Sequence, residues 1–410
     1  MRLLTLIAMA LCALHTYVYA QSQAADPRTL YDSHRWFELR SLASERQVGL
    51  FFQGAVEMAF HQDKRAAEDL NRYITTQPAV ELKLEARELL LGAAFRSGQY
   101  QDALFQAQQI LALKPDAQDI TNFLPTLQVL APFARQTILS RQPSTVKIEL
   151  LDQNLVLPVI IGKATANYIL DNGFSLSGMS ESEAKRLNLT VNTVATRIDT
   201  MSGAPVTVRI AVVPDLILGG LHLRNVAFYV LPDDQPPFNQ LPPGHRGILG
   251  LQVVLALGHF AWQPKSETFT IYRDISTNPG REANLAFGGS SIFVRLVFRG
   301  RPVDMSLDSG AQNTVLYPAF ARQFPDIQKD GVAEQHRVIG VGGSASIKSF
   351  TLPSLDFQLS GRSVILKPAS VLLENNNSTS DRFQGNLGMN LLNQANSVEM
   401  DFGSMTLTLK

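Results

Sequence analysis

The sequence has 410 residues, 45% of them hydrophobic, which is enough apolar material for two or three packed domains. Lysine plus arginine and aspartate plus glutamate each number 36, so the formal net charge is zero. This balance provides no long-range field to attract nucleic acid or an anionic membrane surface, and we expect neither as a partner.

The first residues have the pattern of a secretory signal peptide. A short positive start precedes an apolar run over residues 3–14, and Val18 and Ala20 form a small-residue cleavage site. We expect residues 1–20 to be removed, which predicts a periplasmic or secreted protein with no integral membrane span. The alternative is an inner-membrane anchor formed by an uncleaved N-terminus. The only cysteine, Cys12, lies in this run, so the mature chain has no disulfide, which fits a bacterial periplasm.

Residues 28–140 have helical periodicity, with apolar and charged residues mixed at spacings of three and four. Small residues and prolines recur there in two units: Gly54, Ala66 and Pro78, then Gly92, Ala103 and Pro115. These positions resemble tetratricopeptide repeats, in which small residues let paired helices approach and a proline closes the second helix. Residues 119–140 would then cap the stack. The resemblance implies either a plain packing domain or a platform for a protein partner or substrate.

After Pro143 the texture changes to short β-branched runs separated by glycine, proline, asparagine and aspartate, which is typical of an all-β fold. This part contains an internal duplication, which predicts two lobes over residues 145–275 and 285–410. Each copy ends in a predicted β-hairpin. The intervening residues 276–284 are rich in turn formers and predict a linker.

Two aspartates define the register of the duplication. Asp171 in "ILDNGFSLSG" precedes Gly250 of "GILG" by almost the same distance as Asp308 in "SLDSGAQNTV" precedes Gly388 of "GNLG". In each copy a strand, a glycine turn and a second strand lead up to the aspartate. The aspartate, the later glycine, the upstream strands with their turn and the closing hairpin are four features in register. They indicate that the copies have the same local fold.

The Asp-Ser-Gly loop, followed by Ala-x-x-Thr-Val, resembles the catalytic loop of retropepsin-type aspartic proteases, and the glycine blocks resemble the element beneath that loop. The resemblance covers residues 145–410. It implies an α+β multidomain protein, with a tetratricopeptide-like helical domain followed by two pepsin-like or retropepsin-like lobes of the closed β-barrel type.

The resemblance also implies a function, that of an aspartic endopeptidase acting on a peptide or protein substrate. Asp171 and Asp308 would share one proton and activate a water molecule. No cofactor or metal is expected, because the seven histidines show no metal-ligand spacing. The alternative is a catalytically degenerate lobe pair that binds peptides or a protein without cutting them.

Other residues take supporting roles by the same resemblance. Gly173 and Gly310 let the backbone turn tightly beside the carboxylates, and Ser309 interlocks the two loops. The remaining supports are Asn172 and Thr314 in the loops, Gly250 and Gly388 in the glycine blocks, and Gly203, Gly340, Gly342 and Gly343 in two flap hairpins.

Three residues depart from the family pattern. Asn172 stands where the family has a hydroxyl residue, so a symmetrical interlock is not expected. Phe174 replaces a small residue, and Asn386 replaces an apolar residue in the second glycine block. We expect the latter two to perturb packing near the site.

Overall fold

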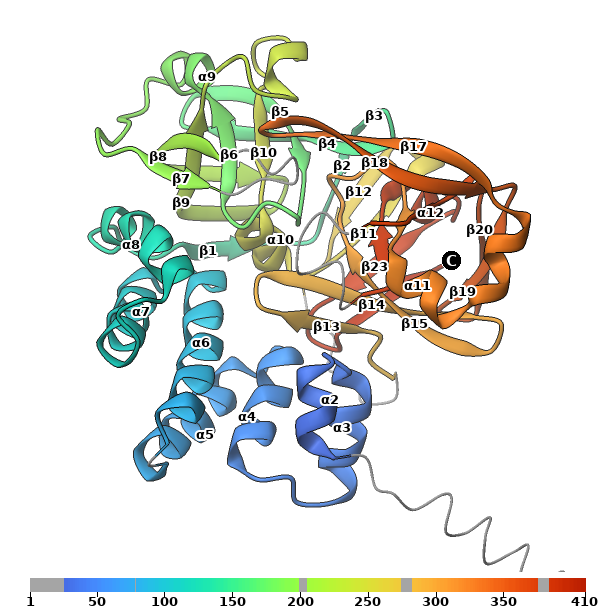
Figure 1. Ribbon diagram of the computed structural model, residues 1–410. Coiled ribbons are helices and arrows are strands. Elements are labelled where there is room, and N and C mark those ends of the chain that lie inside the picture. The colour runs from blue at the N-terminus through green and yellow to red at the C-terminus, as the bar shows by residue number, and fades with distance from the viewer. Residues whose placement is uncertain (1–25, 78, 199–204, 274–281, 375–382) are drawn as a thin grey trace, which may run out of the picture.

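The computed structural model describes residues 26–77, 79–198, 205–273, 282–374 and 383–410. A helical region is followed by two sheet-rich lobes, whose sheets curl into half barrels (Figure 1). The predicted signal peptide, Pro78 and Gly203 lie outside the described residues, as does most of the predicted linker. Across the part of the chain that the structure describes, every helix is too short or too polar to traverse a lipid bilayer.

The helical region comprises α2 (Pro27–Asp32), α3 (Trp36–Glu45), α4 (Leu50–Ala59), α5 (Asp63–Thr76), α6 (Val80–Arg96), α7 (Tyr100–Leu113) and α8 (Gln118–Leu130). It begins where Asp26 caps α2 by accepting the Thr29 N–H. The prediction of helix up to residue 140 is wrong, because β1 (Thr137–Arg141) follows and pairs with a strand of the first lobe. That short, largely exposed stretch becomes a strand because a sheet edge lies beside it.

The small residues of the helical region have different neighbours in its two predicted units. A Cβ at Gly54 of α4 would lie 2.7 Å from Leu70 Cγ of α5, so glycine permits close approach of these two helices. Gly92 of α6 has no such helix neighbour, since its nearest contact is Gly289 of the second lobe. The predicted packing role therefore fits Gly54, whereas Gly92 faces another part of the molecule.

The first lobe is built on one curled sheet with the order β1-β9-β6-β10-β5-β4-β8-β7, with β3 beside β4 and an additional β8–β9 pairing. Two short helices, α9 (Glu181–Arg186) and α10 (Leu251–Leu257), and a 3₁₀ turn at Phe238–Gln240 complete this lobe. Its strands are β3 (Glu149–Leu151), β4 (Asn154–Ile161), β5 (Ala164–Leu170), β6 (Ser177–Ser180), β7 (Thr196–Ile198), β8 (Val206–Leu218), β9 (Leu221–Leu231) and β10 (Gly247–Leu249).

The second lobe repeats this plan with the order β17-β18-β21-β16-β22-β15-β14-β19-β20, and β13 pairs with β14. Its helices are α11 (Pro318–Gln323), a 3₁₀ segment at Pro325–Asp330 and α12 (Met389–Leu392). Its strands are β13 (Leu285–Gly288), β14 (Ser291–Phe298), β15 (Arg301–Leu307), β16 (Val315–Leu316), β17 (Val332–Gly340), β18 (Gly343–Leu352), β19 (Leu355–Leu359), β20 (Arg362–Leu366), β21 (Ala369–Leu372) and β22 (Gly385–Leu387).

A third sheet joins the lobes. The two predicted hairpins form as β11 (His259–Gln263) with β12 (Thr268–Ile271) and as β23 (Val398–Asp401) with β24 (Thr406–Leu409). β11 then pairs with β23 across the duplication, and β2 (Ser144–Lys147) completes the edge beside β12. This cross-pairing fixes the relative orientation of the lobes through backbone hydrogen bonds, since a ladder permits only one register once its faces are buried.

The helical region contacts both lobes. On the first lobe, the Gln252 side chain of α10 accepts from Tyr100 Oη at 2.7 Å and donates to the Phe95 carbonyl at 2.7 Å. On the second lobe, Arg96 donates to the Gly289 carbonyl at 2.9 Å, and its guanidinium lies 4.2 Å from the Phe287 ring centroid. Since Arg96 is 2% exposed and also bonds Asp63, it is a buried charge with a partner.

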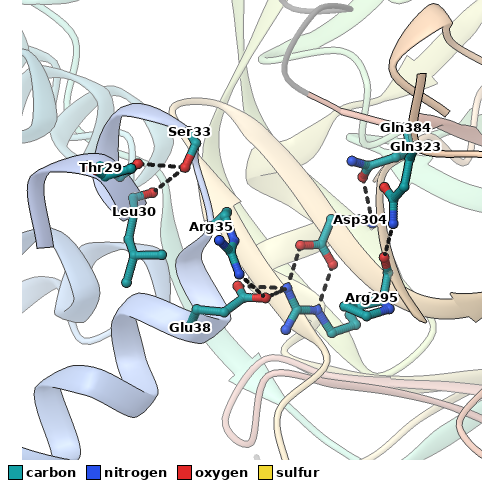
Figure 2. A network of polar contacts seen from close by, with 10 residues as sticks. Thr29, Leu30, Ser33, Arg35, Glu38, Arg295, Asp304, Gln323 and Gln384 are labelled. Atoms are coloured by element: carbon teal, nitrogen blue, oxygen red, sulfur yellow. Dashed lines mark hydrogen bonds and ion pairs between the residues drawn. The ribbon is translucent and has the colours of Figure 1, made fainter. Parts of the chain in front are cut away.

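A second contact between helices and lobe 2 centres on Arg295 (Figure 2). Its Nη2 donates to Glu38 of α3 at 2.9 Å and to Asp304 of β15 at 2.6 Å. Its Nε donates to the other oxygen of Asp304 at 2.7 Å, and the guanidinium lies 4.2 Å from the Phe37 ring centroid. One planar cation thus links a helix to two adjacent strands, a geometry that the fork of arginine matches.

Replacing Arg295 by alanine should destabilise the docking of the helices. The carboxylates of Glu38 and Asp304 would lose the cation that lies between them, leaving only Arg35, 3.5 Å from Glu38, and we expect a loss of roughly 2 to 3 kcal/mol. Chemical denaturation followed by tryptophan fluorescence measures this, since Trp36 begins α3. Arg299→Ala is the matched control, because the Arg299–Asp326 pair is exposed and its loss should change stability by less than about 0.5 kcal/mol. Equal losses in both variants would contradict this role for Arg295.

Candidate active site

Each predicted aspartate follows the end of a strand in the same local arrangement. β5 pairs in parallel with β10, and β15 pairs in parallel with β22. The ladders continue one step further, since Asp171 N–H donates to Leu249 O and Asp308 N–H donates to Leu387 O, both at 3.0 Å. Because the strands of each pair run in the same direction, each aspartate starts its loop directly beside a glycine block.

The glycine blocks lie beneath the aspartate loops, as the sequence predicted. A Cβ at Gly250 would lie 1.9 Å from the Leu176 carbonyl oxygen, and one at Gly388 would lie 2.6 Å from the carbonyl carbon of Asn313. Any side chain at either position would collide with loop backbone, which has no freedom to move aside. Both glycines are therefore required by close packing of the loops against the blocks.

The structure brings Asp171 and Asp308 together. Their carboxyl groups are within hydrogen-bonding reach of each other. A Cβ at Gly310 would lie 2.2 Å from Asp171 Oδ2, and one at Gly173 would lie 2.9 Å from Asp308 Oδ1. Each loop glycine thus faces the aspartate of the opposite lobe, and its small size is what allows this approach.

Backbone donors hold the two carboxylates. Gly173 N–H donates to Asp171 Oδ1 at 2.8 Å, and Gly310 N–H donates to Asp308 Oδ1 at 2.9 Å. Ala311 N–H adds a third bond, to Asp308 Oδ1 at 3.1 Å. The side chains are therefore aimed at each other before any ligand arrives.

Burial raises the pKa of Asp171 from 3.8 to about 8, and the negative charge of Asp308 adds to the shift. Two carboxyl groups this close share a proton over a wide pH range, since ionising both places like charges together. Among the described residues, no group of three or more histidine, cysteine, aspartate and glutamate side chains is placed to hold a metal ion. The arrangement is thus suited to proton transfer.

The two loops interlock through Asn172 and Ser309. The Ser309 hydroxyl accepts from Asn172 N–H at 3.0 Å, and Asn172 Oδ1 accepts from Ser309 N–H at 2.8 Å. Asn172 Nδ2 also donates to the Leu307 carbonyl. The amide thus both accepts and donates, as a hydroxyl would. The interlock forms despite the asparagine, although the two sides use different groups.

Phe174 does not disturb the loop in the way expected from the sequence. A Cβ at Gly178 would lie 2.8 Å from Phe174 Cε1, so the ring occupies space that glycine leaves free. The ring also lies edge-on to Tyr229, with centroids 6.1 Å apart. The corresponding pair in the second copy is Ala311 and Val315, so large and small residues have exchanged places between the copies.

Two supporting contacts were missed in the sequence. Ser177 Oγ accepts from Gly250 N–H at 3.1 Å, which matches the bond from Gly388 N–H to Thr314 Oγ1 at 3.0 Å. Ser177 has the same offset from its aspartate as Thr314, so aligning the copies would have found it. Asn154, the first residue of β4, donates across to the Ser309 carbonyl at 2.9 Å, and no sequence signal indicates this contact.

One predicted flap is well described. β17 and β18 form a hairpin in which Gly340 pairs with Gly343, so the turn contains Val341 and Gly342. The hairpin extends from the second lobe toward the first (Figure 1), where Gly342 N–H donates to Gln235 Oε1 at 3.1 Å. The second predicted flap lies on β7 and β8, but Gly203 falls outside the described residues.

Comparison with protein families supports the fold of the two lobes described above. Residues 157–253 and 294–391 each match the model of the aspartyl protease family. Both lobes are similar to aspartyl proteases. Each matched segment contains one aspartate loop and its glycine block, so the chain has a duplicated aspartyl-protease-like unit. None of the curated proteins matches the chain.

Substitutions at Asn172 test the interlock of these aspartyl-protease-like lobes. Asn172→Ala leaves Ser309 N–H and the Leu307 carbonyl without their partners, and two lost buried hydrogen bonds should cost about 2 to 4 kcal/mol of unfolding free energy. Asn172→Thr is the control, since its hydroxyl can accept and donate, and it should cost less than about 1 kcal/mol. Urea denaturation measures both values. A loss for Asn172→Ala as small as that for Asn172→Thr would show that the interlock does not depend on this side chain.

Proposed function

We propose that the protein is an exported aspartic endopeptidase that hydrolyses peptide bonds with an Asp171/Asp308 dyad. The observation that carries the proposal is the convergence of the two carboxyl groups, one from each lobe, with Gly310 against Asp171. The match of both lobes to the aspartyl protease family supports it. Because each lobe supplies one aspartate, a single chain provides the whole dyad.

The mechanism follows from a pair that holds one proton. The protonated partner donates to the carbonyl oxygen of the scissile bond. The ionised partner takes a proton from a water molecule, whose oxygen attacks the carbonyl carbon. The product of this step is a neutral tetrahedral diol, with no covalent bond to the enzyme.

The second step returns the dyad to its starting state. The carboxyl group that took the proton from water gives it to the leaving nitrogen while the carbon–nitrogen bond breaks. The other carboxylate takes a proton from the diol, which becomes the carboxylic acid product. The proton count of the pair is unchanged over the cycle, so the site needs no cofactor for this chemistry.

The flap supports a polypeptide as the substrate. The β17–β18 hairpin reaches from one lobe to the other and contacts Gln235. A hairpin in this position can exclude water and pair its backbone with an extended peptide.

Single substitutions test the dyad. Asp171→Asn and Asp308→Asn should each lower the cleavage rate of an unfolded protein substrate by roughly 10²- to 10⁴-fold, because each removes a proton donor or acceptor. Gel assays from acidic to neutral pH, with and without a pepstatin-like inhibitor, measure the effect. Asp326→Asn is the control, since this exposed carboxylate of the second lobe pairs only with Arg299 among the described contacts.

Two outcomes would count against the proposal. Cleavage that persists in both dyad variants would assign it to another protein or site. Tight peptide binding by the parent chain without any cleavage would favour the alternative, a degenerate lobe pair that acts as a binding module.

Export is also part of the proposal, and it rests on residues 1–20. Mass spectrometry of the protein purified from the periplasm should show a mature chain that begins at Gln21. A full-length chain in the inner-membrane fraction would favour the uncleaved anchor instead. A full-length chain in the cytoplasm would contradict export.

The helical region bonds the first lobe through Gln252 of that lobe and the second lobe through its own Arg96. These contacts favour a bracing role. The tetratricopeptide-like character and a protein partner for this region stay predictions. Binding of the protein to immobilised unfolded substrate, measured with and without a pepstatin-like inhibitor in the lobes, would distinguish a docking platform from a brace.

A further inference from the structure

A chain of polar side chains lies behind one of the two aspartates. Asn386 Nδ2 donates to Asp308 Oδ2 at 3.2 Å. The Ser306 hydroxyl donates to Asn386 Oδ1 at 2.6 Å, and Ser306 is in turn hydrogen-bonded to the phenol of Tyr317. The same hydroxyl also lies 3.2 Å from the Gly385 carbonyl oxygen, a longer contact than the one to the amide oxygen. This polar chain keeps the amide nitrogen of Asn386 turned toward Asp308.

The equivalent positions of the first lobe have no such chain. Ile248 stands where the second glycine block has Asn386, and Ile169 stands where β15 has Ser306. Both isoleucines are buried, at 2% and 7% exposure. Ser180 takes the place of Tyr317, and its hydroxyl caps α9 by accepting the Glu183 N–H. Asp308 thus has a side-chain amide donor beside it, and the equivalent residue of the first lobe is the apolar Ile248.

We propose that Asn386 is a positioning residue that keeps Asp308 ionised and so confines the shared proton to Asp171. An N–H donor stabilises the ionised carboxylate in preference to the protonated form. Ile248 and Ile169, at the equivalent positions of the first lobe, carry no donor that could do the same for Asp171. The inference rests on the proposed function, to which it adds a fixed division of roles: Asp171 as the acid and Asp308 as the base.

The expected pH dependence of activity follows from which ionisation states of the aspartate pair the Asn386 amide stabilises. Besides Asn386, the groups that face Asp308 are Asp171 from the opposite loop and the Gly310 and Ala311 N–H donors, and Tyr317 is near enough for the Asp308 charge to raise the pKa of its phenol, after burial. Loss of the first proton ionises Asp308, so removing the amide donor raises the lower pKa of the pair. Loss of the second proton ionises Asp171 while Asp308 is already charged, so the higher pKa stays where it was.

The test is the pH profile of kcat/KM for Asn386→Leu, which keeps the size of the side chain and removes the donor. We expect the acidic limb to move up by about one pH unit, the effect of one hydrogen bond to a charged group. The basic limb should not move. A merely structural role would lower activity at all pH values without separating the limbs.

Two further variants make the test specific. Ile248→Leu changes packing at the matching position of the first lobe and should leave both limbs unchanged. Ser306→Ala keeps Asn386 but frees its amide to rotate, so the acidic limb should move in the same direction by a smaller amount. If Asn386→Leu does not fold, Ser306→Ala carries the test alone.

A readout without activity separates this inference from the proposed function. Carboxyl carbon NMR of aspartate-labelled protein, assigned with Asp171→Asn and Asp308→Asn, follows each titration directly. A parent chain that never cleaves peptides would overturn the protease, while a titration of Asp308 that moves up in Asn386→Leu would still support the positioning role. An Asp308 titration and acidic limb that are unchanged in the folded variants would overturn the inference.

Discussion

The close approach of Gly310 to the Asp171 carboxyl is the contact on which the site depends. At this distance the glycine cannot carry a Cβ, and the loops of two separate lobes must share one small volume. Two carboxyl groups held so close are electrostatically unfavourable when both are ionised. The fold must therefore press the lobes together against this repulsion, and several interactions act in that direction.

Three interactions hold the lobes together, and two of them lie outside the loops. The β11–β23 ladder joins the lobes through backbone hydrogen bonds, which set their register. The interlock of Asn172 with Ser309 ties the loops directly. The helical region then contacts both lobes, through Gln252 on one side and Arg96 on the other. A helical region that bonds both lobes restricts their relative motion, which favours a preformed pair of carboxyl groups over one assembled by the substrate.

The duplication is symmetrical in its backbone and asymmetrical in its side chains. Phe174 packs over Gly178, and the equivalent residues of the other copy are Ala311 and Val315, so a large and a small residue have exchanged places. The interlock uses an amide on one side and a hydroxyl on the other. Because one chain encodes both lobes, each half can change independently, and the polar chain behind Asp308 is such a change.

The sequence by itself determined the features that depend on local pattern. The change from a helical to a strand pattern, the register of the two aspartate loops and the hairpins that end each copy all follow from alternation, turn residues and spacing, although the first strand begins at Thr137 and not after Pro143. These predictions held because strand and turn preferences act over a few residues. The position of Gly250 and Gly388 followed for the same reason, since each block repeats at a fixed offset.

Only the tertiary structure decided what depends on neighbours distant in the chain. The strand at Thr137–Arg141 was expected to be helical, and it forms because β9 lies beside it. Asn386 looked like a packing fault in its own strand, and it becomes a hydrogen-bond donor because β22 lies parallel to β15, next to Ser306 and Asp308. A polar residue in an apolar strand has a cost that its sequence shows and a partner that only the folded chain supplies.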